Sequence, residues 1–273
     1  MLHKILPAQV PLTYAPVGRC IYCGAAEALS DEHIIPYGLG GRLVLPASSC
    51  AACAKITGAF EGTCLRTCFG PLRMLYDLPS RRKRERPDTL PLKVKRTADE
   101  DWTDMQVARE DYPFLVLFPH LSGPTLLSGR TDAEQGAKAN RFWIRGASES
   151  AGFKPHLNEL CQQLGVHSVM PTAEFRVEEF CLMLAKIAHA YAVAECGPEL
   201  VEPTLLSMIR TRDFSERSRL MGSIRLMGRD DPRARLHDIS VLDTKEGWLS
   251  VGVQLLAPMD TPTYLVHAGR RRE

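Results

Sequence analysis

The sequence lacks any apolar run of the roughly 18 residues that a membrane-spanning helix needs. Its N-terminus also lacks the pattern of a secretory signal, because Pro7, Pro11 and Pro16 interrupt the region where an apolar stretch would lie. We find no internal repeat, and no low-complexity segment beyond a basic run near the middle of the chain. These absences argue against a membrane or secreted protein, so we expect a cytoplasmic one.

Length and composition leave room for a hydrophobic core. Of the 273 residues, 45% are hydrophobic and 24% are charged, which fits one large domain or two smaller ones. Nine cysteines, four of them in paired spacing, favour metal binding in a reducing compartment over a disulfide framework. The other five are expected to be small buried residues on helices: Cys64, Cys68, Cys161, Cys181 and Cys196.

The paired cysteines form two Cys-x-x-Cys motifs, Cys20/Cys23 and Cys50/Cys53. Each such turn can direct two sulfur atoms at one ion about 2.3 Å away, so four thiols at this spacing suit a single tetrahedral zinc. The motifs therefore predict a zinc site that encloses the segment between them.

That enclosed segment carries Asp31, Glu32 and His33 on a short predicted strand. A neutral imidazole can take a proton from water, and carboxylates are the oxygen ligands that a divalent ion prefers. Together they are the smallest set of groups needed for phosphodiester hydrolysis, in which the ion polarises the phosphate. The alternative is structural: an acidic side chain caps a turn and His33 packs.

The arrangement resembles the HNH endonuclease family with zinc knuckles. The similarity covers about residues 18–65 and rests on Cys-x-x-Cys-Gly from Cys20, the run Asp31 to Pro36, the pair Gly40-Gly41, and the string Cys50-Ala51-Ala52-Cys53. It implies a ββα-metal fold, in which two strands and a helix hold a catalytic divalent ion and a separate zinc stabilises the unit. The implied activity is hydrolysis of phosphodiester bonds in nucleic acid, with DNA favoured over RNA.

Individual roles follow from the same resemblance. His33 matches the general base that activates water, Glu32 matches the acidic ligand of the catalytic ion, which would be Mg²⁺ or a similar divalent ion, and Asp31 matches a helper. The structural zinc ligands would be Cys20, Cys23, Cys50 and Cys53.

The sequence departs from the family at the position after the last cysteine. The family usually has an asparagine there, whereas this chain has Ala54, which offers no side-chain ligand. Glu61, two helical turns further along the same face, is a candidate replacement that would complete the catalytic-ion site with Glu32. Glu61 could equally be a solvated helix residue. A second hypothesis is therefore a catalytically degenerate zinc module that acts as a nucleic-acid-binding or regulatory protein.

For the whole chain we predict an α+β fold, with an N-terminal zinc-stabilised ββα-metal module followed by a C-terminal domain of mixed helices and antiparallel strands. The predicted divisions are an HNH-like domain over 1–78, a basic connector over 79–98 and an α+β domain over 99–273. The connector's basic residues would either attract nucleic-acid phosphates or form a solvated linker. The last domain would recognise substrate or form a homodimer.

Periodicity and turn residues place the expected elements. Helices are predicted over residues 51–78, with an end or a kink at Gly70-Pro71, and over 155–164, 173–195 and 202–212. Strands are predicted over 29–36, 114–118 and 141–145, and an antiparallel meander over 239–242, 248–256 and 263–266.

Overall fold

The N-terminal part is built on two antiparallel strands that lead directly into a helix. The computed structural model describes residues 7–80, 86–113, 115–128, 142–146, 153–171, 174–199, 201–224, 235–243 and 247–272. Strand β2 (Leu29–His33) pairs with β3 (Leu43–Cys50), the short β1 (Leu12–Thr13) adds in parallel to β3, and α1 (Ala51–Arg66) follows without a loop. The register of β2 shifts between Ser30 and Glu32, which marks a bulge at Asp31.

The turn between β2 and β3 depends on glycine. It contains the short 3₁₀ helix η1 (Tyr37–Leu39), which ends at Gly40 in the left-handed conformation. At Gly41, an added Cβ would lie 2.1 Å from the carbonyl oxygen of Ile35, so no larger residue fits. The imidazole of His237 donates from Nε2 to the carbonyl of Leu39 (3.0 Å), which ties this turn to the C-terminal part of the chain.

The helix predicted over 51–78 is two helices. Helix α1 ends at Arg66, and a second helix, α2 (Gly70–Leu75), begins after a short break. Pro71 sits in the first turn of α2, where its missing N–H costs nothing, but it could not continue α1. The Gly70-Pro71 signal for an interruption is thus confirmed.

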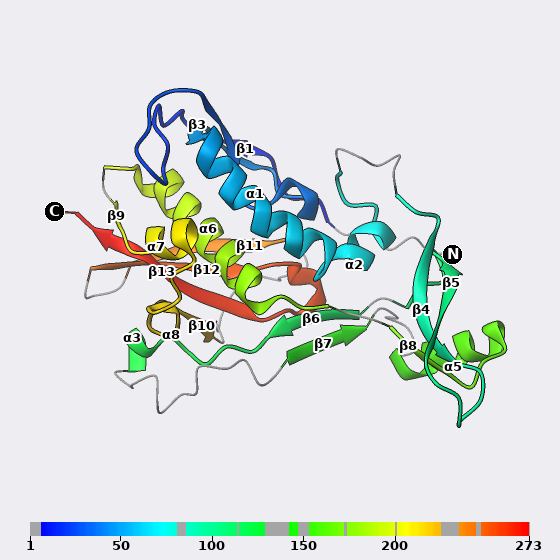
Figure 1. Ribbon diagram of the computed structural model, residues 1–273. Helices are drawn as coiled ribbons and strands as arrows, with labels where there is room; N and C mark the ends of the chain where they lie inside the picture. The colour runs from blue at the N-terminus through cyan, green and yellow to red at the C-terminus, as the bar shows by residue number, and fades with distance from the viewer. Residues whose placement is uncertain are drawn as a thin grey trace.

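A long central helix, α6 (Val177–Cys196), lies between α1 and the main sheet (Figure 1). The sheet has the order β10 (Met221–Ile224), β13 (Thr263–Arg271), β12 (Trp248–Gln254), β11 (Asp238–Asp243), and β9 (Val201–Pro203) also pairs with β13. Because α6 is covered on both sides, every residue from Phe180 to Ala190 is buried. The predicted antiparallel meander is confirmed by the pairing of β11, β12 and β13.

Two predicted helix starts are wrong. Helix α6 begins at Val177, with Arg176 as its extended N-cap, and not at residue 173. The segment predicted as a helix from residue 202 starts as strand β9, and α7 covers only Leu206–Thr211. Pro203 explains the second error, because a proline disfavours helical backbone at the residue before it.

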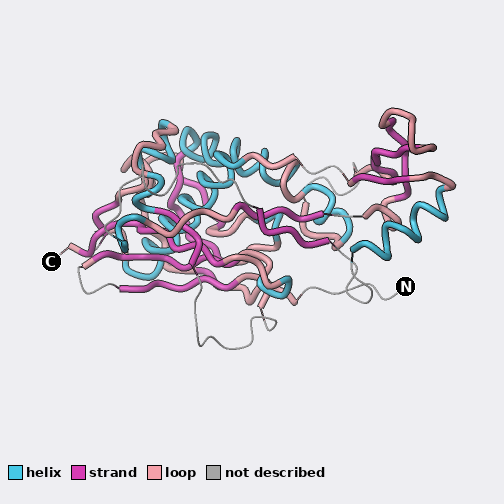
Figure 2. Tube along the Cα trace, turned by 90° about the horizontal axis from the view of Figure 1, so that it is seen from below, coloured by secondary structure: helices cyan, strands magenta, loops and turns pink. Residues whose placement is uncertain are grey.

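A smaller group of elements lies at one end of the molecule (Figures 1 and 2). Strand β4 (Thr89–Lys95) pairs with β5 (Thr103–Ala108) and β8 (Ser168–Met170), and α5 (Phe153–Leu164) contacts β8. The stretch predicted as a connector over 79–98 therefore contains a paired strand; its residues 81–85 lie outside the described part. The β4 strand is amphipathic, since Leu90, Leu92 and Val94 alternate toward a small core of their own.

The remaining elements complete a mixed α/β fold with several antiparallel sheets. Strands β6 (Leu115–Pro119) and β7 (Phe142–Gly146) form an antiparallel pair, and α3 (Thr125–Ser128), α8 (Arg217–Leu220) and η4 (Ala257–Met259) are short helices. One hydrophobic core runs from Cys20 to Ala268, so residues of the predicted first and last domains share it. The domain boundaries themselves stay predictions. Among the described helices, none combines the length and apolarity that crossing a membrane requires.

Candidate metal centre and buried charge cluster

The four paired cysteines meet at one point. Their sulfur atoms all lie within 4.8 Å of one another, and Sγ of Cys23 is 3.6 Å from Sγ of Cys50. A tetrahedral zinc with Zn–S bonds of about 2.3 Å requires sulfur separations of about 3.8 Å. The donor set and its spacing therefore fit a metal ion such as zinc.

Local backbone geometry explains how each cysteine pair is positioned. In the first pair, the N–H of Gly24 donates to the carbonyl of Cys20 (2.8 Å), and Gly24 adopts the positive φ that closes this turn. In the second pair, Cys50 is the extended N-cap of α1, which places its thiol beside the backbone N–H of Cys53 in the first turn of the helix. That backbone contact lowers the pKa of the Cys50 thiol to about 7 and favours the thiolate that a metal binds.

A second cluster, buried beneath α1, joins three charged side chains. The Nζ of Lys186 on α6 lies 2.5 Å from Oε1 of Glu32 on β2 and 2.8 Å from Oε1 of Glu61 on α1. The exposed side-chain fractions are 0%, 8% and 16% for Lys186, Glu32 and Glu61. We call these three residues the Lys186 triad. Lys186 also donates to the carbonyls of His33 and Ile34, the latter at 3.3 Å.

Electrostatics hold the triad in a charged state. Burial opposes the charge of Lys186, but the carboxylates of Glu32 and Glu61 outweigh it, and the net result is a raised pKa for the lysine. Burial raises the pKa of Glu61 despite the nearby ammonium, and the charge of Glu32 adds to the rise. One ammonium balances the charge of only one of the two carboxylates.

The predicted catalytic residues separate into two groups. Glu32 and Glu61 are brought together, as the replacement hypothesis required, although around an ammonium. Asp31 is exposed at the bulge, where its Oδ1 accepts from the N–H of Ala47 (3.2 Å), and it takes no part in the triad. His33 is half-buried at the end of β2, with its ring 5.4 Å from that of Tyr37.

Tertiary packing brings residues to this site that the sequence alone did not identify. Lys186 is the one charged side chain between Phe180 and Ala194, and an isolated charge in an apolar helix is the signal that could have found it. Tyr22 is fully buried next to the triad, and the charges of Glu32 and Glu61 add to burial in raising its pKa well above its usual value. His189, on the same helix as Lys186, is buried and donates from Nε2 to the carbonyl of Ile21 (2.8 Å).

The cysteines outside the metal centre behave as expected in part. Cys64, Cys68 and Cys181 are buried in the main core, whereas Cys161 and Cys196 are only partly buried. Cys64 and Cys68 have no further metal-binding side chains grouped with them among the described residues.

No family model, curated protein or solved structure matches this chain. The resemblance to HNH endonucleases therefore rests on the motifs of residues 18–65 alone.

Proposed function

We propose that this protein is a nucleic-acid-binding or regulatory protein, built on an HNH-like zinc module in which a lysine has replaced the catalytic ion. The observation that carries the proposal is the position of Lys186 Nζ, within 2.8 Å of both carboxylates that would have to bind that ion. The four-cysteine centre, which fits zinc, would stabilise the module in either functional state.

The ammonium and a divalent ion compete for the same oxygens. Mg²⁺ takes oxygen ligands at about 2.0–2.1 Å in a nearly octahedral shell that keeps several waters. Lys186 is completely buried and already fills the space between Glu32 and Glu61. A divalent ion about 4 Å from the ammonium would be repelled by roughly 8 kcal/mol at an effective dielectric constant of about 20.

The sequence supports the same conclusion independently. The family's usual asparagine after the last cysteine is Ala54, so the helix offers no amide ligand near its start. Without a bound ion, there is no polarised phosphate at which His33 could direct a water molecule.

The competing candidate is the predicted metal-dependent nuclease, which would cleave DNA or RNA. It is favoured by the convergence of Glu32 and Glu61 on one point and by the position of the half-buried His33 at the adjoining strand end. This candidate requires Lys186 to leave a site in which it also donates to two backbone carbonyls.

Cleavage and binding assays separate the two candidates. Purified protein is incubated with supercoiled plasmid or with RNA in the presence of Mg²⁺, Mn²⁺ or Ni²⁺, and compared with His33→Ala. We expect no divalent-ion-dependent cleavage, together with salt-sensitive binding of nucleic acid by both proteins. Nicking by the wild type that disappears in His33→Ala would establish the nuclease. If the protein neither cleaves nor binds nucleic acid, both the nuclease and the nucleic-acid-binding role are excluded.

A further inference from the structure

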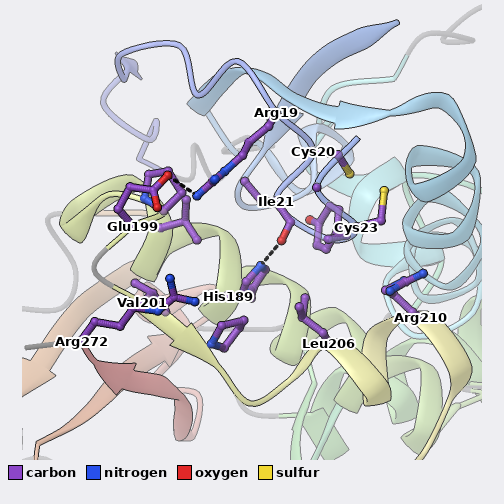
Figure 3. Close-up of a pocket in the computed structure, with 15 residues that line it drawn as sticks. Arg19, Cys20, Ile21, Cys23, His189, Glu199, Val201, Leu206, Arg210 and Arg272 are labelled. Carbon is purple, nitrogen blue, oxygen red and sulfur yellow. Dashed lines mark hydrogen bonds and ion pairs between the residues drawn. The ribbon is translucent and has the colours of Figure 1, made fainter. Parts of the chain in front are cut away.

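A pocket of about 360 Å³ lies beside the metal centre, between the first cysteine pair and the segment that joins α6 to α7 (Figure 3). We call it the knuckle pocket. Its volume falls at the lower end of the range for small-ligand sites, about 300–1,000 Å³. It is separate from the Lys186 triad, although His189 in its wall lies one helical turn after Lys186 on α6.

The walls of the knuckle pocket divide into an apolar part and a cationic part. Ile21, Val193 and Leu206 supply apolar surface. Arg19, Arg210 and Arg272 supply three guanidinium groups, against a single carboxylate, Glu199. A site with this division suits a ligand that has a flat apolar body and an anionic end.

The charges of the knuckle pocket are only partly neutralised. Arg19 is paired with Glu199 at 2.5 Å, but within the described part of the chain neither Arg210 nor Arg272 has a carboxylate partner. Four thiolates around one zinc would carry a net charge of −2, and Arg210 lies on the same side of the pocket as Cys23, where it offsets that charge (Figure 3). Arg272 lies on the opposite side, so its guanidinium is available to an anion.

The pocket also contains a buried acceptor that the protein leaves unused. His189 is 1% exposed, its Nε2 donates to the carbonyl of Ile21, and its Nδ1 has no partner among the described residues. Burial lowers the pKa of this histidine, which keeps the ring neutral and Nδ1 an acceptor. A hydroxyl or amino group of a ligand would satisfy it.

We infer that the knuckle pocket binds a nucleotide unit, with its phosphate held by Arg272 and its sugar or base against the apolar wall beside His189. Guanidinium groups bind phosphate with paired, charge-assisted hydrogen bonds, and a nucleotide also carries the hydroxyl and amino donors that the histidine lacks. The inference deepens the proposed function, because it places one nucleic-acid contact at a named pocket, but it does not require that function. A free nucleotide would supply the same chemistry.

Binding assays with four probes test the inference: inorganic phosphate, AMP, and a single-stranded oligonucleotide with or without a 5′-phosphate. Each is titrated against the wild type, Arg272→Gln and Arg210→Gln, with Arg42→Gln as the control, since Arg42 is an exposed arginine outside the pocket. We expect Arg272→Gln to weaken AMP or 5′-phosphorylated oligonucleotide about tenfold. For the oligonucleotide, the dependence of log K on log salt should become shallower by about 0.7. Arg42→Gln should behave as the wild type.

The outcomes distinguish a free nucleotide from a nucleic-acid end, and they separate failure of the pocket from failure of the proposed nucleic-acid role. Equal affinity for AMP and the 5′-phosphorylated oligonucleotide indicates a free-nucleotide site, whereas preference for the 5′-phosphorylated oligonucleotide over AMP indicates a nucleic-acid end. Both support the inference. If nucleic acid binds but neither pocket variant changes the affinity of any probe, the inference is overturned and the proposed function stands. If AMP binds through Arg272 but no oligonucleotide does, the pocket stands and the nucleic-acid role fails.

Discussion

Replacing Lys186 by methionine is the perturbation that tests the buried triad most directly. The change removes the ammonium between Glu32 and Glu61 and leaves two carboxylates and two backbone carbonyls without their donor. Removing one partner of a buried ion pair typically costs about 3–5 kcal/mol. Methionine fills nearly the same volume, so no large cavity adds to this cost. We therefore expect Lys186→Met to lose about 3–5 kcal/mol of unfolding free energy at neutral pH.

The size of that loss should depend on pH, with a definite sign. Burial already raises the folded-state pKa of Glu61, and without the ammonium nothing opposes that rise. A raised pKa contributes stability that is complete below the unfolded value of about 4.3 and is lost as pH rises through the folded value. The difference between variant and wild type should therefore be largest at neutral pH and should shrink as the pH falls toward 4.3.

Urea unfolding followed by circular dichroism at several pH values measures both effects. Lys55→Met is the matched control, because Lys55 is exposed on α1 and its replacement should change stability by less than about 0.5 kcal/mol. The folded variant should also gain an Mn²⁺-dependent rise in melting temperature that the wild type lacks, since the carboxylates become free to bind the ion. A loss below about 1 kcal/mol, or a loss that is the same at all pH values, would refute the triad's role.

Three further predictions concern the turn, the metal and a buried histidine. Gly41→Ala should destabilise the protein by more than about 2 kcal/mol, because the new Cβ would lie 2.1 Å from a backbone oxygen. The control Gly58→Ala, in open space on α1, should stabilise the protein by about 0.5–1 kcal/mol. Equal effects of the two changes in urea unfolding would contradict this. The purified protein should hold one zinc per chain by atomic absorption. The variant with Cys20 and Cys23 both changed to Ser should lose the zinc and unfold its N-terminal strands. Zinc near zero in the wild type purified without chelators would exclude the site. Burial lowers the pKa of His237 to about 4, so this histidine binds fewer protons in the folded protein than in the unfolded protein. The unfolding free energy should therefore fall by about 3 kcal/mol as the pH drops from about 6.5 to 4. A His237→Gln variant that shows the same fall would count against this residue as the cause.

The elements that could be predicted from sequence are those whose signals are local. Each Cys-x-x-Cys turn positions its own two sulfurs, and the meander of β11, β12 and β13 follows from short branched segments separated by turns. The interruption at Gly70-Pro71 was equally predictable from the sequence, since proline cannot continue a helix. The wrong start of α6 lies at an element end, where local propensity is weakest, whereas the wrong start of α7 overlooked the local signal of Pro203.

The role of Glu61 shows where local reasoning stops. From the sequence, it was either an ion ligand or a solvated residue. In the described structure its side chain is only 16% exposed and its Oε1 lies 2.8 Å from Nζ of Lys186, while its role as an ion ligand stays a prediction. No local pattern links these two residues, because α1 and α6 meet only when both pack into the same core. The same packing makes the knuckle pocket, whose walls come from segments far apart in the chain.

The sequence by itself determined the four-cysteine centre, the strand that carries Glu32 and His33, and the helix that follows, because these depend on spacings of a few residues. Only the tertiary structure decided what fills the space between the two glutamates. Because α6 is covered on both sides, its one lysine cannot reach water. A buried ammonium needs carboxylate partners to offset the loss of its hydration, and here those partners are Glu32 and Glu61.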